Sequence, residues 1–137
     1  QAYWPSYFGT VARLLKPGGR ACVQSIVIDD ALFERYVQGT DFIQQYVFPG
    51  GCLPSPARFR AAAQQAGLRV VEELAFGSDY AETLRRWHRQ FTQQHAQVLA
   101  QGFDAKFLRT WEFYLAYCEA ALDSGSIDVV QYTLVKN

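Results

Sequence analysis

Residues 21–28 form a short, almost uninterrupted apolar run, Ala-Cys-Val-Gln-Ser-Ile-Val-Ile, that leaves few possible folds for this chain. The run is β-branched and too short for a typical helix, so it predicts a strand covered on both faces. Residues 4–15 are apolar at helical spacing, with Pro5 in the first turn, and they end at residues 16–19, Lys-Pro-Gly-Gly, which cannot continue a helix. A helix, a glycine-rich turn and a buried strand in this order are typical of an α/β layered domain.

Two more strands are predicted, over residues 68–76 and 127–135, where β-branched residues recur. A helix is predicted over about 30–37. Another begins at Ser55-Pro56, as N-cap and first helical residue, and stops near Gly67. Residues 46–54, just before Ser55, include two prolines and two adjacent glycines, and this composition predicts a loop.

The residues between the last two predicted strands have helical periodicity. One helix is predicted over 79–99 and another over 104–122, each with an apolar face. The face of the first carries Tyr80, Leu84, Trp87, Phe91 and Val98, and that of the second carries Phe107, Trp111, Tyr114, Leu115, Cys118 and Leu122. A long helical insertion between two late strands usually serves a site rather than the scaffold.

Composition excludes several classes of protein. The 137 residues suit one domain, and the apolar half of the composition rules out intrinsic disorder. Lys+Arg and Asp+Glu number 13 each, a balance that argues against a nucleic-acid-binding protein. No apolar run is long enough to cross a membrane. GxSxG, HExxH and Walker motifs are absent from the sequence, and the two Gly-Gly pairs do not follow a predicted strand directly.

The cysteines, and the absence of methionine, indicate the redox environment of the chain and its relation to a longer protein. The three cysteines, Cys22, Cys52 and Cys118, form neither a CxxC pair nor a zinc pattern, so we expect reduced, buried thiols in a cytosolic protein. The sequence contains no methionine, not even at its start. We therefore expect a piece of a longer protein.

Several polar and aromatic residues allow a functional and a structural interpretation. Gln24 interrupts the apolar strand and is either a ligand residue or an amide paired with neighbouring backbone, which the pattern favours. Tyr114 lies on an aromatic stripe, and such stripes usually belong to a core. Trp87 lies beside Arg85, Arg86 and Arg89, so it suits a membrane surface or, as the spacing favours, a core next to a solvated charged face. His88 and His95 are seven residues apart, which does not favour a metal pair.

Longer motifs carry a resemblance to a known family. They occur at residues 3–8 (YWPSYF), 14–20 (LLKPGGR), 42–54 (FIQQYVFPGGCLP), 79–84 (DYAETL) with Trp87, 111–115 (WEFYL) with Cys118, and 128–131 (DVVQ). Over essentially its whole length the chain resembles the C-terminal half of the cyclopropane-fatty-acyl-phospholipid synthases. These are S-adenosylmethionine-dependent enzymes related to the mycolic acid cyclopropane synthases.

The resemblance implies the C-terminal part of a Rossmann-like class I methyltransferase fold, which is α/β. Residues 20–28 would be its fifth strand, and 68–76 and 127–135 its last two, one of them antiparallel to the rest. Residues 1–137 would then be one portion of a single domain, with a helical insertion at about 78–123 covering the acyl chain. The cofactor-binding N-terminal half would lie outside this chain, so we expect the chain alone to be inactive.

The resemblance also implies an activity and a site. The family transfers a methylene from S-adenosylmethionine to the cis double bond of unsaturated phospholipid acyl chains, forming cyclopropane fatty acids, and a bound bicarbonate is thought to act as the base. Carried across, the base pocket would comprise Tyr114, the backbone of Ile26, and Gln24 where the family has a histidine. The substrate-binding residues would be Phe48, Pro49, Gly50, Tyr80, Trp87 and Trp111. No metal is implied.

The implied partners are phospholipid acyl chains and, at the periphery, the inner face of the cytoplasmic membrane, with no nucleic acid. The uncovered flank of the sheet also suggests a homo-oligomer. Two alternatives remain open. One is a related methyltransferase that acts on another acceptor, such as an amine. The other is a non-catalytic lipid-binding module.

Overall fold

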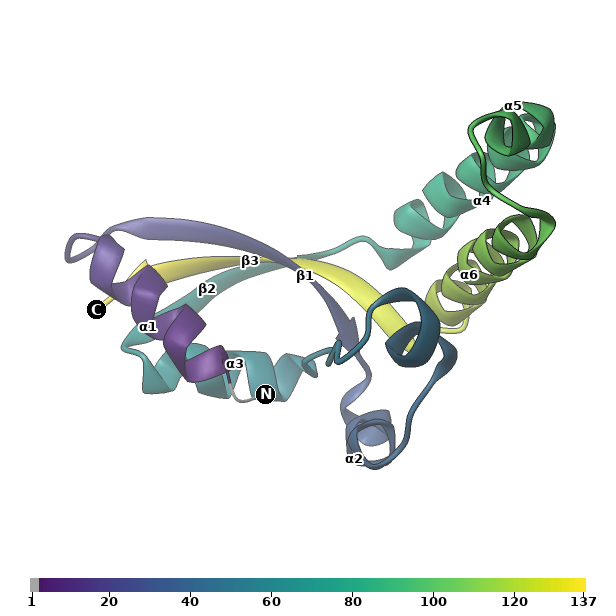
Figure 1. The fold of residues 1–137 in the computed structure, drawn as a ribbon. Helices are drawn as coiled ribbons and strands as arrows, with labels where there is room; N and C mark the ends of the chain where they lie inside the picture. Colours follow the sequence, from purple (N-terminus) through teal and green to yellow (C-terminus); the bar gives the residue numbers. More distant parts are fainter. Residues whose placement is uncertain (1–2) are drawn as a thin grey trace. The chain divides into compact units, whose positions relative to one another are not determined.

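The computed structural model describes residues 3–137, which divide into two compact units. The sheet unit comprises the chain up to Phe76 together with Ile127–Asn137, and the helical unit comprises Gly77–Ser126. Within the described residues, every strand belongs to the sheet unit, and the helical unit is inserted in the sequence between the last two strands (Figure 1).

The sheet consists of β1 (Arg20–Ile28), β2 (Leu68–Ala75) and β3 (Ile127–Lys136), in the order β1–β3–β2. β3 runs antiparallel to both neighbours, so β1 and β2 are parallel to each other. The three predicted strands are confirmed, as is the presence of one antiparallel strand among them. Parallel strands need a crossover connection, and the helices between β1 and β2 provide it.

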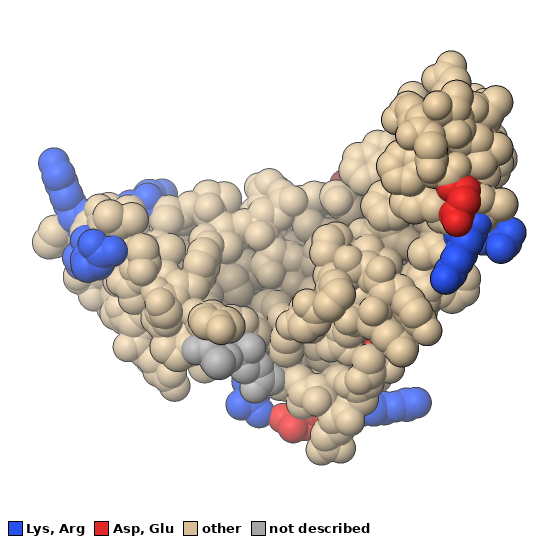
Figure 2. Space-filling view, in the orientation of Figure 1, with Lys and Arg blue, Asp and Glu red and all other residues tan. Residues whose placement is uncertain are grey.

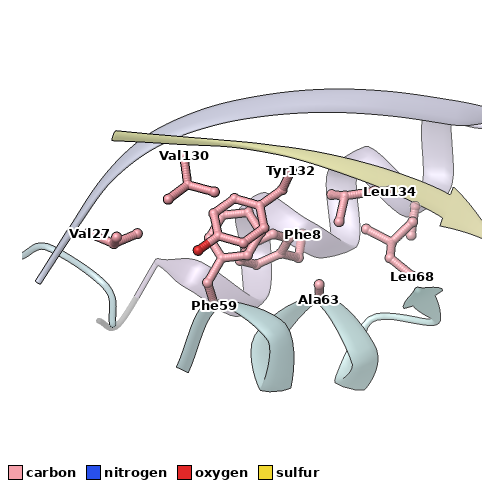
Figure 3. Close-up of a cluster of buried hydrophobic side chains, with 9 residues drawn as sticks. Phe8, Val27, Phe59, Ala63, Leu68, Val130, Tyr132 and Leu134 are labelled. Atoms are coloured by element: carbon pink, nitrogen blue, oxygen red, sulfur yellow. The ribbon is translucent and has the colours of Figure 1, made fainter. Parts of the chain in front are cut away.

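The core of the sheet unit lies between the sheet and two helices, α1 (Trp4–Leu14) and α3 (Pro56–Gln65), which pack on the same face (Figure 1). Three aromatic rings form its centre: Phe59 of α3 stacks on Tyr132 of β3 with centroids 3.9 Å apart, and Phe8 of α1 meets Phe59 edge-on at 5.0 Å (Figure 3). All three rings are almost completely buried. Their contact joins both helices to the central strand.

The predicted ends of these two helices are confirmed. Pro5 lies in the first turn of α1, and the chain turns after that helix through Gly18, whose φ of 72° is unfavourable for other residues. The hydroxyl of Ser55 accepts a hydrogen bond from the backbone N–H of Arg58 (3.4 Å) and caps α3. Gly67, with a φ of 78°, follows the end of α3.

The prediction that the first strand is covered on both faces is wrong for the described residues. Because α1 and α3 pack on one face only, burial alternates along β1: Val27 is buried, whereas Cys22, Gln24 and Ile26 are exposed on the other face. The prediction of buried thiols holds only for Cys118. Cys22 is exposed for the reason just given, and Cys52 is half-buried.

The connection from β1 to α3 contains α2 (Asp30–Gln38) and one π-helical turn, η1 (Ile43–Val47). The predicted helix near residues 30–37 is confirmed, but the predicted loop begins only at Phe48 because η1 continues through Val47. Before η1, Asp41 Oδ1 accepts from the backbone N–H of Gln44 (2.8 Å) and Gln44 Oε1 accepts from that of Asp41 (3.0 Å). This reciprocal pair stabilises a helical turn that the composition did not indicate.

The helical unit consists of α4 (Gly77–Gln93), α5 (His95–Ala100) and α6 (Ala105–Asp123). The helix predicted over 79–99 is therefore broken at Gln94. At the start of α5, the ring of His95 packs against Phe91, four residues earlier, and its Nε2 lies 3.0 Å from Glu112 Oε1 on α6. The helix predicted over 104–122 is confirmed, with Asp104 Oδ1 accepting from the N–H of Phe107 (2.8 Å) as its N-cap.

Two surface properties follow from the composition. On the face drawn in Figure 2, charged side chains stand in small groups on a mostly uncharged surface. Among residues 3–137, no helix has the length and apolar character needed to cross a membrane.

Candidate substrate site

The two long helices of the helical unit, α4 and α6, pack along each other. Their buried residues are small or aliphatic: Gly77, Ala81 and Leu84 on α4, and Leu108, Leu115, Cys118 and Leu122 on α6. Arg85 of α4 also bridges the helices, since its Nε lies 2.8 Å from Glu119 and its Nη2 3.0 Å from Asp123. Arg85 thus lies on the predicted solvated face, with its side chain 37% exposed, and also links α4 to α6.

A groove of about 500 Å³ runs between these helices, and we call it the aromatic groove. Its walls are Trp87, Gln90, Phe91 and Gln94 from the α4 side and Trp111, Tyr114 and Leu115 from α6. The rings of Trp111 and Tyr114 lie 4.9 Å apart, and Phe107 extends the row by stacking on Trp111 at 5.9 Å. The volume falls in the range of small-molecule sites, and the walls are mainly apolar.

Tyr114 brings a hydroxyl to this apolar wall. Burial, together with neighbouring Cys118 and Tyr80, raises the pKa of Tyr114 to about 12. The phenol therefore keeps its proton at neutral pH, so it can donate a hydrogen bond and does not act as a base. The interpretation of Tyr114 as a core residue is wrong, because its half-buried ring lines the groove.

The aromatic groove brings together most of the site residues predicted on the helices. Trp87, Trp111 and Tyr114 line it, and Tyr80 contacts Trp87 with ring centroids 6.3 Å apart. The preference for Trp87 as a core residue is wrong, since its side chain is 50% exposed at the groove.

The sequence prediction did not assign Gln90, Phe91, Gln94 or Leu115 to the site. Helical spacing contained the signal for them: Phe91 and Gln94 follow Trp87 by four and seven residues, and Leu115 follows Trp111 by four. The prediction used this periodicity to find a core. In the structure, part of the apolar face of each helix is not covered when α4 packs on α6, and it lines the groove instead.

Gln24 and Ile26 lie two residues apart on the exposed face of β1. Gln24 Oε1 accepts a hydrogen bond from Gln131 Nε2 on β3 (3.1 Å), so the predicted pairing with neighbouring backbone is replaced by a pairing between side chains. Ile26 is opposite Val129, whose carbonyl accepts instead from the N–H of Phe76 (2.9 Å). Ile26 and Val129 are therefore a pair without mutual hydrogen bonds, because such pairs alternate with hydrogen-bonded pairs in an antiparallel ladder. The backbone N–H of Ile26 is consequently directed away from β3, to the edge of β1 that no strand of residues 3–137 contacts.

Phe48, Pro49 and Gly50 form the exposed loop that follows η1. Gln44 Nε2 donates to the carbonyl of Gly51 (3.0 Å), and the N–H of Leu53 donates to the hydroxyl of Tyr36 (3.0 Å), so side chains hold the segment that follows Gly50. Gly50 borders a second hollow of about 560 Å³, lined by Val37, Gly39, Thr40, Gln44, Gly50, Gly51 and Cys52. Phe48 and Pro49 are not among its lining residues.

The described residues do not form the cofactor site of a Rossmann-like fold. That site needs a glycine-rich turn directly between a strand and a helix N-terminus. β1 is followed at once by Asp29, whose side chain caps α2, and the glycine pair at residues 18–19 precedes the strand. Residues 3–137 contain no group of three His, Cys, Asp or Glu side chains placed to hold a metal ion.

The fold is that of part of a class I S-adenosylmethionine-dependent methyltransferase, with a helical insertion before the last strand. The solved structure of the mycolic acid cyclopropane synthase CmaA1, complexed with SAH and CTAB, superimposes on 99% of this chain with a TM-score of 0.88 and 25% identity. This chain covers 50% of that structure.

The amino-acid sequence agrees with the fold. The family model of the mycolic acid cyclopropane synthetases matches residues 1–132, and the chain belongs to this family. It is 43% identical over 97% of its length to the tuberculostearic acid methyltransferase UfaA1 of Mycobacterium tuberculosis, and 31% identical over 93% to the cyclopropane-fatty-acyl-phospholipid synthase of Escherichia coli. It spans about a third of the length of these relatives, 31% and 32%.

Proposed function

We propose that this chain forms the acyl-chain-binding part of an enzyme that converts the cis double bond of an unsaturated phospholipid acyl chain into a cyclopropane ring. The aromatic groove carries the proposal, because its largely apolar walls suit a hydrocarbon chain and family membership supplies the reaction class. When bound elsewhere in the full-length enzyme, S-adenosylmethionine would supply an electrophilic methyl group to an alkene, which is a weak nucleophile.

The walls of the groove suit such a reaction. Addition of a methyl group to an alkene leaves positive charge on the acyl chain, and water would trap that cation. With an acyl chain in the groove, the indole rings of Trp87 and Trp111 would shield the reacting carbon atoms from water and present π faces that favour a nearby cation. Both effects protect the acyl chain until a proton leaves and the ring closes.

The groups that hold the base belong to the same proposal. The family resemblance assigns a role in binding bicarbonate to the hydroxyl of Tyr114 in the helical unit and, in the sheet unit, to the side-chain amide of Gln24 and the backbone N–H of Ile26. Tyr114 retains its proton for donation, and Gln24 keeps its Nε2 donors because Gln131 occupies only its oxygen. An amide cannot titrate near neutral pH, so Gln24 holds the base without relaying a proton.

The experiment uses the full-length gene product that contains this chain. It would be expressed in a bacterium that lacks cyclopropane lipids, and the phospholipid acyl chains would be examined by mass spectrometry and proton NMR. Acyl chains that gain one CH2 unit and show high-field ring protons support the proposal. Unchanged acyl chains, from a well-expressed protein that binds S-adenosylmethionine, would overturn it.

A second product is favoured by one observation, the 43% identity to a protein named as a tuberculostearic acid methyltransferase. In this alternative the same lipid double bond accepts the methyl group but no ring forms. The NMR experiment distinguishes the two products, because a branched or methylene-bearing acyl chain gives no cyclopropane ring protons. A methylated amine in the headgroup, with unaltered acyl chains, would indicate instead a methyltransferase that acts on an amine.

Location and assembly complete the proposal. We place the full-length enzyme in the cytoplasm, in peripheral contact with the inner membrane face where its substrate lies. For the chain taken alone, we expect self-association through β1, because no strand of residues 3–137 pairs with its outer edge. Light scattering of the isolated chain tests this expectation, and a monomer would contradict it.

A further inference from the structure

One side of α6 combines exposed aromatic rings with basic side chains. Lys106, Arg109, Phe113 and Tyr117 are spaced so that they share a face of the helix, opposite the buried Leu108, Leu115 and Leu122, and we call them the α6 outer face. Phe113 is 51% exposed and Tyr117 is 37% exposed, and their rings stack with centroids 5.8 Å apart. Such large apolar side chains in water mark a contact surface when they occur together.

The positive charge of this face is not neutralised within the protein. Neither Lys106 nor Arg109 forms an ion pair with any of residues 3–137. The arginines of α4 differ, because Arg85 (2.6 Å), Arg86 (2.8 Å) and Arg89 (3.9 Å) all lie near the carboxylate of Glu82. Hydrogen bonds from Arg86 and then Arg85 hold the pKa of that carboxyl below its usual range.

The carboxylates of α6 lie away from its outer face and already have partners. Glu119 and Asp123 accept hydrogen bonds from Arg85 at 2.8 and 3.0 Å. Glu112 accepts from the hydroxyl of Thr92 at 3.2 Å, and Asp104 caps the helix. The outer face therefore presents two cations and two aromatic rings with no carboxylate among them.

We propose that the α6 outer face docks the enzyme onto an anionic phospholipid surface. Aromatic rings prefer the headgroup level of a bilayer, and basic side chains are attracted to anionic lipids. Two rings provide too little apolar area for a stable contact with a second protein, which favours a lipid surface as the occupant. The inference rests on the proposed function in one respect, namely that the substrate is a lipid, and it assigns the contact to α6 rather than to Trp87 with its neighbouring arginines.

Vesicle co-sedimentation of the full-length gene product tests the charged half of this face. The vesicles contain phosphatidylglycerol with phosphatidylcholine, and pure phosphatidylcholine vesicles serve as the neutral reference. Each basic side chain near an anionic surface is worth roughly fivefold in partitioning, so the double variant K106A/R109A should bind about 25-fold more weakly. The matched control R86A/R89A removes the same charge from α4, where Arg86 pairs with Glu82 at 2.8 Å, and should bind within about twofold of the wild type, because the proposal places the lipid contact on α6.

The aromatic half has its own variant. Phe113→Ser should weaken binding to both kinds of vesicle several-fold, whereas Tyr7→Ser, which removes a similarly exposed ring (50%) from α1, should not. Thermal unfolding of each variant establishes that it is folded. Equal losses in the two double variants, unaltered binding of K106A/R109A and F113S, or absence of wild-type binding to anionic vesicles would each overturn the proposal.

Activity on dispersed substrate separates this inference from the proposed function. With unsaturated phospholipid dissolved in detergent, K106A/R109A should turn over as fast as the wild type, since no membrane surface has to be reached. A protein that binds anionic vesicles through Lys106 and Arg109 but modifies no acyl chain would refute the proposed function and leave the docking face intact. An enzyme that modifies acyl chains and binds vesicles equally well without these two side chains would refute the docking face alone.

Discussion

The two units use the same residue types for opposite purposes. In the sheet unit, the rings of Phe8, Phe59 and Tyr132 are at most 4% exposed and close a core. In the helical unit, Trp87 and the half-buried Trp111 and Tyr114 leave a groove open between two helices. Aromatic content therefore does not separate scaffold from site. What separates them is whether a second layer covers the rings, as α1 and α3 cover one face of the sheet.

The largest effect should come from breaking the closed core. Phe59→Ala removes the ring that touches both Phe8 and Tyr132, and we expect the free energy of unfolding to fall by about 3–5 kcal/mol. Urea unfolding of the full-length gene product measures this loss. Phe103→Ala, which truncates a ring that is 46% exposed, is the control and should cost less than about 1 kcal/mol. Similar losses in the two variants would show that the sheet core is not the tighter of the two aromatic clusters.

The next largest effect is expected on turnover, from the Tyr114 hydroxyl in the aromatic groove. Tyr114→Phe keeps the ring in the wall but removes the hydroxyl donor, so turnover should fall about a hundredfold, as for the loss of one positioned donor, with stability nearly unchanged. Steady-state kinetics on unsaturated phospholipid measure it, and Tyr7→Phe on α1 controls for the loss of a tyrosine hydroxyl elsewhere. Wild-type turnover in Tyr114→Phe would remove Tyr114 from the base pocket.

The local rules of the sequence were sufficient for the scaffold. Three strands, the Ser55 cap and the Gly67 stop depend on neighbouring residues alone, and all are observed. The break of the long helix at Gln94 was not predicted, because neither glycine nor proline marks it; next to it, His95 contacts Glu112 of α6, which is distant in sequence. The turn η1 likewise depends on paired side chains, those of Asp41 and Gln44, rather than on composition.

The site was predictable only in part. Periodicity placed Trp87, Trp111 and Tyr114 on apolar helix faces, but it cannot tell a closed core from a groove, and only the family resemblance assigned them to a site. Gln24 was expected within a buried strand, and its exposure follows from the placement of both covering helices on one face of the sheet. Only the way the helices pack on the sheet and on each other decides these two points.

A pH titration compares the two units through their tyrosines. Burial raises the pKa of Tyr114 and of Tyr132 to about 12, whereas an unfolded tyrosine titrates near 10. The folded state therefore keeps these two protons to a higher pH than the unfolded state. The resulting contribution to the free energy of unfolding is complete below about pH 10 and is lost as the pH rises toward 12. Urea midpoints measured between these pH values should fall, and each of Tyr114→Phe and Tyr132→Phe should make the fall less steep. A slope that neither substitution alters would contradict this origin of the alkaline sensitivity.

The smallest effect is expected from Tyr132→Phe at neutral pH. The Tyr132 hydroxyl is buried and has no hydrogen-bond partner among residues 3–137, so the folded state bears the cost of its lost hydration. Phenylalanine keeps the stacking on Phe59 and removes that cost, so the free energy of unfolding should stay constant or rise by up to about 1 kcal/mol. Turnover should not change, because the ring faces the core of the sheet unit (Figure 3). The same chemical change thus separates the units: loss of a hydroxyl should leave activity intact at Tyr132 and reduce it at Tyr114. A marked loss of stability in Tyr132→Phe would instead show that this hydroxyl has a partner, such as a buried water, and that the closed core contains a polar contact.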